Sequence, residues 1–177
     1  NPSSPHPELA HSSPGGMGSL MMDTWSEDVV DFNIWVGELE LLVGSSKGKA
    51  LDARACFELL TSMHMSLDRS GKAAIVGHQK KCEDILYRIL DKGARPPVRR
   101  LVASCLCKLY HKGDNISLYS RHSELQGKLG SLKDKSDLSV RLGVIECLAA
   151  LARAHGAQLG GALTETVALA SKHTRAQ

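Results

Sequence analysis

The chain has 177 residues, of which 42% are hydrophobic and only 4% are aromatic, and its formal net charge is +3 at pH 7. This length is enough to bury a hydrophobic core, while the shortage of aromatic residues argues against a β-sandwich. No stretch approaches the roughly 18 apolar residues of a membrane span, and the first twenty residues lack the apolar core of a signal peptide.

The first 22 residues contain four of the six prolines and show no helical periodicity. Their apolar content is too low to offset the conformational entropy lost on folding, so we predict that residues 1–22 are a disordered leader rich in Pro, Ser and Gly. The rest of the chain, residues 23–177, is expected to form one domain of helical repeats.

Apolar side chains recur with helical spacing through this domain, beginning with Phe32, Trp35, Val36 and Leu39. This period predicts amphipathic helices. Nowhere do β-branched residues alternate over five or more positions, as a strand would require. The chain is therefore predicted to be all-α. Seven helices are expected, over residues 27–44, 50–67, 72–90, 96–113, 118–129, 138–156 and 160–172.

Local signals mark several ends of these helices. Ser26 and Asp137 suit N-caps, because their side-chain oxygens accept hydrogen bonds from free backbone N–H groups in a first turn. Either Asp114 or Ser117 is expected to cap the fifth helix in the same way. Gly93 suits the end of the third helix, where a left-handed residue is common.

Two segments repeat each other at a distance of 42 residues. In each, a Val-Arg pair opens an apolar helical stretch, and four structural positions map onto four others: Val98, Arg99, Leu106 and Leu109 onto Val140, Arg141, Leu148 and Leu151. A period near 40 with only helical patterning is typical of HEAT and armadillo repeats. We therefore predict a HEAT/armadillo-type α-solenoid, a right-handed superhelix of antiparallel helix pairs. Such repeats present binding surfaces.

The five cysteines have an odd count and no disulfide spacing, and each falls within a predicted helix. We expect mostly buried, free thiols and a reducing, intracellular compartment. His78 and Cys82 lie four residues apart on one helix face, but a zinc site needs three or four ligands and no second pair follows. Cys105 and Cys107 lie on roughly opposite faces of one helix, so they do not chelate together. No metal or other cofactor is predicted.

No catalytic unit is visible in the sequence. The eight histidines are scattered, and the adjacent residues Ser120-Arg121-His122-Ser123 are not a triad, because triad members are brought together by the fold. The segment Gly44-Ser45-Ser46-Lys47-Gly48 lacks the spacing of a phosphate-binding loop. We expect a non-enzymatic protein without catalytic or cofactor-binding residues.

Charge is unevenly distributed along the chain. Residues 21–43 contain six acids and no base, whereas residues 71–113 contain ten bases and three acids. Six cations of the basic region form a candidate interaction surface: Lys80, Lys81, Arg88, Lys92, Arg95 and Arg100. This surface is either a solvated face or a contact for an acidic protein or an anionic lipid. A nucleic-acid site would need interleaved aromatic residues, and with Tyr87 alone nearby no nucleic-acid partner is expected.

The two interpretations of the cations differ in what should lie beside them. Binding of an anionic partner is favoured if the cations share one exposed face without acidic neighbours. Internal complementarity is favoured if the acids of the first helix lie against them: Asp28, Asp31, Glu38 and Glu40. Arg99 and Arg141 are a separate case, because in HEAT-type repeats the corresponding arginine bridges to an acidic group of the adjacent repeat.

An ordered series of motifs runs from Lys81-Cys82-Glu83-Asp84 through Gly93-Ala94-Arg95 and Tyr119-Ser120-Arg121 to Leu125-Gln126-Gly127. Over about residues 26–174, this series resembles the N-terminal region of the plant Sweetie family. That family is similar to the HEAT-repeat-containing protein 5 family of animals and fungi. The resemblance implies a very long α-solenoid, of which this chain would form the opening repeats.

The resemblance also implies a function. It implies a scaffold for protein–protein interaction in vesicle traffic and protein localisation between endosomes and the Golgi, with clathrin-adaptor-associated partners. For the plant branch it implies a link to carbohydrate metabolism and development. The expected location is the cytoplasm, with peripheral association at the trans-Golgi network or endosomes. The alternative is a peripheral module that binds anionic lipid or nucleic acid through its cations.

Overall fold

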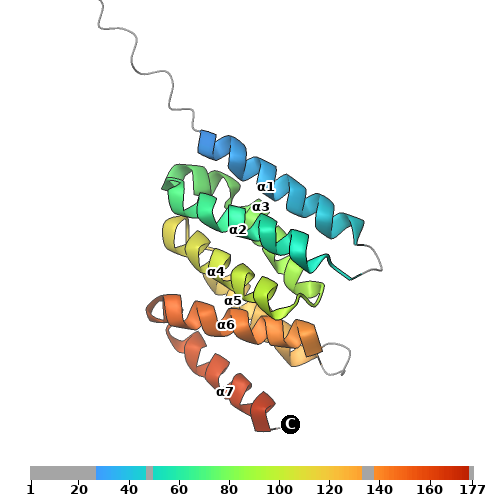
Figure 1. Cartoon of the computed structure of the whole chain (residues 1–177). Helices are drawn as coiled ribbons and strands as arrows, with labels where there is room; N and C mark the ends of the chain where they lie inside the picture. Colours follow the sequence, from blue (N-terminus) through green and yellow to red (C-terminus); the bar gives the residue numbers. More distant parts are fainter. Residues whose placement is uncertain (1–26, 47–49, 133–137, 176–177) are drawn as a thin grey trace, which may run out of the picture.

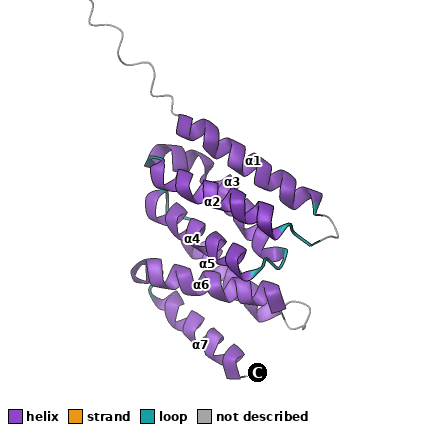
Figure 2. Cartoon of the chain, in the orientation of Figure 1, coloured by secondary structure: helices purple, strands orange, loops and turns teal. Residues whose placement is uncertain are grey.

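The computed structural model describes residues 27–46, 50–132 and 138–175, which form seven α-helices (Figure 1). All other residues in these three ranges lie in turns and loops, so the all-α prediction is confirmed there (Figure 2). The predicted leader and the predicted N-caps Ser26 and Asp137 lie outside the described residues. The helices are α1 (Glu27–Ser45), α2 (Ala53–Arg69), α3 (Lys72–Asp91), α4 (Pro96–Lys112), α5 (Leu118–Ser131), α6 (Leu138–Leu159) and α7 (Gly161–Arg175).

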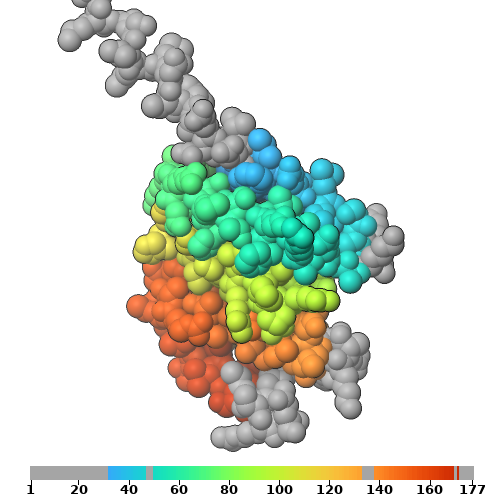
Figure 3. Space-filling model, in the orientation of Figure 1, coloured from blue at the N-terminus to red at the C-terminus, as the bar shows by residue number. Residues whose placement is uncertain are grey.

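The helices stack in chain order and form two layers. In one layer α4 packs between α2 and α6. Behind it, α3 packs on α4 and α5 packs on α6. α1 packs on α2 and α3, and α7 packs on α5 and α6 at the opposite end of the stack. The space-filling view shows the same order as successive bands of colour (Figure 3). This arrangement is compatible with an α-solenoid.

The ends of α2 and α3 follow from local chemistry. α2 begins at Ala53 instead of residue 50, because Oδ1 of Asp52 accepts hydrogen bonds from the backbone N–H groups of Arg54 and Ala55 at 3.0 and 3.1 Å. These bonds satisfy two of the donors that every helix start leaves free. Gly93 follows α3 with a φ of 69°. That left-handed conformation agrees with its predicted role at a helix end.

Residues at the start of α5 and near the end of α6 bind distant parts of the chain. Ser117 occupies the N-cap position of α5 without a side-chain cap hydrogen bond, and its hydroxyl instead donates to Glu83 of α3 at 2.7 Å. α6 continues beyond the predicted end at Gly156 to Leu159, with a kink at His155, where φ is −129°. The imidazole of this residue lies 3.1 Å from the carbonyl oxygen of Cys107.

Positions related by the 42-residue repeat are buried in the core. Buried apolar side chains fall at matching positions of α4 and α6, namely Val102, Cys105, Leu106 and Leu109 and their counterparts Val144, Cys147, Leu148 and Leu151. One period earlier, α2 buries Cys56, Leu60, Met63 and Leu67, which lie 42 residues before the buried Val98, Val102, Cys105 and Leu109, whereas His64 takes the position of Leu106. The repeat therefore extends to a third helix. Sequence analysis missed it because α2 keeps the apolar character of most of these positions, but not the one of Leu106, and keeps few of the residue types.

Candidate interaction surfaces

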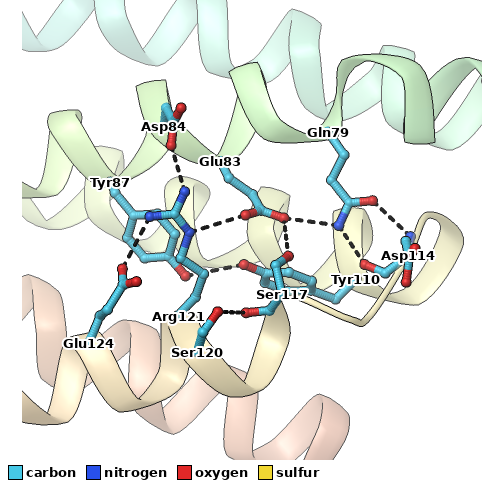
Figure 4. A network of polar contacts seen from close by, with 10 residues as sticks. All are labelled: Gln79, Glu83, Asp84, Tyr87, Tyr110, Asp114, Ser117, Ser120, Arg121 and Glu124. Carbon is cyan, nitrogen blue, oxygen red and sulfur yellow. Dashed lines mark hydrogen bonds and ion pairs between the residues drawn. The ribbon is translucent and has the colours of Figure 1, made fainter.

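A network of polar side chains joins α3 to α5 (Figure 4). At its centre is Glu83, whose side chain is only 3% exposed. Arg121 donates a hydrogen bond from Nε to Oε2 of Glu83 at 3.2 Å. Its terminal nitrogens donate to Oδ1 of Asp84 at 2.6 Å and to Oε2 of Glu124 at 3.1 Å. The guanidinium also lies 5.3 Å from the ring centroid of Tyr87, within the range of a cation–π contact.

The other oxygen of Glu83 is bonded as well. It accepts hydrogen bonds from Nε2 of Gln79 at 2.9 Å and from the hydroxyl of Ser117 at 2.7 Å. Gln79 also binds the backbone of Asp114, because its Oε1 accepts from the N–H at 2.7 Å and its Nε2 donates to the carbonyl oxygen. A carboxylate with both oxygens bonded is poorly placed to accept a proton from a substrate. The network therefore serves as a joint between helices.

A second cluster, between α2 and α4, contains the residue types of a hydrolase triad. Nε2 of His64 lies 2.8 Å from the hydroxyl of Ser104, while Nζ of Lys108 lies 3.2 Å from Nδ1 of His64 and also pairs with Asp68. Because an ammonium group only donates hydrogen bonds, Nδ1 is the acceptor and the ring proton lies on Nε2. His64 thus donates towards Ser104 and does not act as its base, the reverse of a triad. Burial, followed by the charge of Lys108, lowers the pKa of His64, which favours the neutral ring.

The two arginines of the sequence repeat both make structural contacts. Arg99, whose side chain is 11% exposed, donates from Nε to Oε2 of Glu146 on α6 at 2.9 Å. This is the bridge to the next repeat that was predicted for it. Arg141 donates from Nη2 to the backbone carbonyl oxygen of Leu132, just after α5, at 2.9 Å.

The six cations of the candidate surface are exposed, but they are divided among several places. Lys80, Lys81 and Arg88 lie on α3. On this helix Asp84 is three residues from Lys81 and four from Arg88, and Asp91 is three residues beyond Arg88. Residues at these separations are neighbours on a helix surface, so acids are interleaved with the three cations.

The remaining three cations lie at or beyond the α3–α4 connection. Lys92 and Arg95 line a small hollow at that connection, and Nζ of Lys92 donates to the carbonyl oxygen of Ser46 at 3.4 Å. Arg100 lines a groove between α4 and α6, whereas Lys80 lines a different groove between α3 and α5. The structure thus separates the cations of α3 from that of α4.

The acids of α1 do not explain the whole charge pattern. Glu38 and Glu40 are exposed, and the side chains of Asp28 and Asp31 lie outside those that the structure describes. Around Arg100 the acidic neighbour is Glu146 of α6, whose Oε1 lies 4.0 Å from Nε of the arginine. Part of the charge complementarity therefore comes from helices that follow the basic region.

The cysteines are free thiols, and all but Cys107 are buried. Burial raises the pKa of Cys56 to about 12, which disfavours a reactive thiolate.

Nδ1 of His78 donates to the carbonyl oxygen of Ala74 at 2.9 Å. Across residues 27–46, 50–132 and 138–175, no three His, Cys, Asp or Glu side chains are grouped to hold a metal ion. Nor is any helix of these ranges long and apolar enough to cross a bilayer.

Two open grooves run between neighbouring helices of the same layer. The groove between α4 and α6 has a volume of about 620 Å³ and is lined by alanines with Arg100 and Arg153 among them. The groove between α3 and α5 has a volume of about 490 Å³ and includes much of the Glu83–Arg121 network. The first groove has the more apolar floor, and the second is occupied by charges that already bind each other.

Sequence analysis named Glu83 and Arg121 only within motifs, without the pair that they form, and did not single out Arg153. The first two are partners across neighbouring repeats, 38 residues apart, and Arg99 and Glu146 are similarly 47 residues apart. Opposite charges separated by roughly one repeat length were the signal that would have found these pairs. Arg153 has no such signal in the sequence, because it is a candidate only through the groove that it lines.

Comparison with known proteins agrees with the motifs of the sequence. No protein-family model matches the chain, and no solved structure matches it. The chain is similar to Protein SWEETIE of Arabidopsis thaliana, with 38% identity over 141 residues. The match covers 80% of this chain but only 6% of that protein. The predicted resemblance is therefore confirmed: over most of its length, this chain resembles a small part of Protein SWEETIE.

Proposed function

We propose that the chain is part of a HEAT/armadillo-type α-solenoid, a right-handed superhelix of antiparallel helix pairs, and acts as a scaffold for protein–protein interaction. The observation that supports this most directly is the joining of successive units by ion pairs, Arg99 with Glu146 and Arg121 with Glu83. Units that are joined in this way and stacked in chain order expose long grooves. Such grooves suit extended contact with another protein.

The scaffold is proposed to be non-enzymatic and to need no cofactor. The geometry of two clusters with catalytic residue types, one around Glu83 and one around His64, supports this proposal. Both oxygens of Glu83 are bonded within the fold, and the tautomer of His64 is wrong for activating Ser104. An activity that is purified with the chain and abolished by a single substitution would contradict this proposal.

The proposed setting is traffic and protein localisation between endosomes and the Golgi. It rests on the similarity to Protein SWEETIE and on the further resemblance of its family to the HEAT-repeat-containing protein 5 family. The proposed partners are clathrin-adaptor-associated proteins, and the proposed location is the cytoplasmic surface of the trans-Golgi network or endosomes. A link to carbohydrate metabolism and development would follow for a plant protein of this kind.

Proximity labelling in plant cells tests this role. The full chain is fused to a biotin ligase, and the matched control is the same ligase fused to an unrelated helical-repeat protein of similar size. We expect adaptor and endosomal proteins to be enriched with the chain over the control. Identical sets of labelled proteins from both fusions would contradict the trafficking role.

One observation favours the alternative function, a peripheral module for anionic lipid or nucleic acid. α4 and α6 together carry six Lys and Arg residues against the single acid Glu146. The separation of Lys80 from Arg100 into different grooves argues against one continuous anionic surface. Co-sedimentation with phosphatidylserine vesicles and retention on single-stranded DNA measure the two branches of this alternative directly.

A further inference from the structure

The groove between α4 and α6 has a floor of small side chains. Ala103 of α4 and Ala149, Ala150 and Ala154 of α6 line it. The distance of closest approach between packed helices depends on the size of the side chains at the contact. A floor of alanines therefore allows another helix to approach these two closely.

The rim of the same groove has an excess of positive charge. Glu146 is the one acid that lines it, and its carboxylate is held at 2.9 Å by Arg99. Arg100 lies 4.0 Å from that carboxylate, with 75% of its side chain exposed. Arg153 is exposed and pairs with no acid in the described part of the chain. Three guanidinium groups against one carboxylate leave two positive charges uncompensated.

The spacing of these charges matches a helical repeat. Glu146 lies beside Arg100, and Arg153 follows Glu146 by seven residues on α6. Seven residues of helix span about 10 Å along the axis. A partner helix with carboxylates seven residues apart has the same separation, and its residues between them, at i+3 and i+4, lie on the same face.

We infer that the α4–α6 groove is a docking site for an acidic amphipathic helix of a partner protein. Its carboxylates at i and i+7 pair with Arg100 and Arg153, and its apolar side chains at i+3 and i+4 pack on the alanine floor. This is the helix-in-groove mode of recognition, with charge complementarity at the rim setting specificity. The inference deepens the proposed scaffold function and rests on it.

The test uses the full chain and fluorescent helical peptides of about 15 residues, a length at which an isolated helix is marginally stable in water. One peptide carries Glu at i and i+7 with Ala and Leu at i+3 and i+4, and a second carries Lys in place of both Glu residues. The variant is Arg100→Glu combined with Arg153→Glu. The matched control is Lys81→Glu with Arg88→Glu, which makes the same change of net charge on α3.

We expect saturable binding of the Glu peptide, measured by fluorescence anisotropy, and none of the Lys peptide. Affinity should fall about tenfold or more in the groove variant and change little in the α3 control, because only rim charges that face the ligand act on its binding. Equal losses in both variants, or no binding by the wild type, would overturn the inference. Binding of phosphatidylserine vesicles but not of the Glu peptide, lost in the groove variant, would overturn it in favour of a membrane surface.

Further measurements separate failure of the groove from misfolding of the variant and from failure of the scaffold proposal. Circular dichroism checks that the groove variant is folded, and Arg100→Gln with Arg153→Gln repeats the test without introducing negative charge. Proximity labelling is then carried out with the groove variant. Adaptor labelling by the wild type together with failure of the Glu peptide would refute the groove but leave the scaffold standing, whereas background labelling by the wild type would refute the scaffold itself.

Discussion

Arg121 on α5 and Glu83 on α3 form an ion pair with an N–O distance of 3.2 Å, although 38 residues separate them in the sequence. The carboxylate is nearly inaccessible, with 3% of its side chain exposed, and the guanidinium is 22% exposed. A buried charge is costly unless it is paired and fully hydrogen-bonded. The pair therefore fixes the position of α5 relative to α3, because a shift between the two helices would separate Arg121 from Glu83.

Substitution of Arg121 by Ala is expected to lower the free energy of unfolding by about 3–5 kcal/mol, because it leaves a buried carboxylate without its partner. Urea denaturation measures this loss. Glu124→Gln is the control, since Glu124 pairs with the same arginine but is 62% exposed, and it should cost less than about 1 kcal/mol. Similar midpoints for the two variants would show that burial of Glu83 does not govern the effect.

Leu106→Ala and Leu148→Ala are each expected to cost about 2–5 kcal/mol, because each leaves a cavity between helices. The two leucines occupy equivalent positions of the repeat and are 0% and 2% exposed. Leu41, which is 75% exposed on α1, provides the control, and its replacement by Ala should change stability by about 0.5 kcal/mol or less. Wild-type denaturation midpoints for both core variants would contradict the alignment of the repeats.

Gly113 and Gly127 are expected to respond oppositely to substitution by Ala. A Cβ atom at Gly113 would lie 2.5 Å from Oε1 of Gln79 and 2.6 Å from the carbonyl oxygen of Leu109, whereas one at Gly127 would meet nothing within 4 Å. We expect Gly113→Ala to destabilise the protein by about 1–3 kcal/mol through overpacking. Gly127→Ala lies within α5 and should stabilise it by up to about 1 kcal/mol. Thermal unfolding of both variants provides the comparison, and equal melting temperatures would refute the crowding at Gly113.

His122 is expected to make stability depend on pH. Its Nε2 lies 3.0 Å from the hydroxyl of Thr166, which donates to the carbonyl oxygen of Ala162, so Nε2–H is the donor between them. Its Nδ1 is buried, and no described residue offers it a hydrogen-bond partner. Burial lowers the pKa of His122 below its ordinary value of 6.5. The folded protein thus favours the neutral form of this ring.

The sign of the pH effect follows from this lowered pKa. As the pH falls below about 6.5 the unfolded chain binds the proton more readily than the folded chain, so stability is lost as the pH falls towards the folded-state pKa. Urea denaturation between pH 7 and pH 5 should show a slope of up to about 1.4 kcal/mol per pH unit from this group. His122→Gln should reduce the slope, while substitution of the exposed His111 should not. An unchanged slope in His122→Gln would exclude this residue as the cause.

The helices were predictable because their signals are local. Apolar spacing along α1 predicted Phe32, Val36 and Leu39 as inward positions, and all three are buried. The left-handed Gly93 at the end of α3 was predicted from its residue type in the same way. The start of α5 at Leu118 agrees with the prediction, but the hydroxyl of Ser117 binds Glu83 of another helix instead of capping its own.

The sequence by itself determined the all-helical architecture and the 42-residue spacing, because both follow from the periodicity of residue types along the chain. Only the tertiary structure decided which charges meet. Glu83 follows Cys82 on a helix whose charged residues are otherwise exposed, and it is buried because α5 covers it. Arg100 and Arg153, 53 residues apart in the sequence, line one groove because α4 and α6 pack side by side. The exposure and pairing of a charge are set by the neighbouring helices and not by its own helix, so local sequence patterns do not contain them.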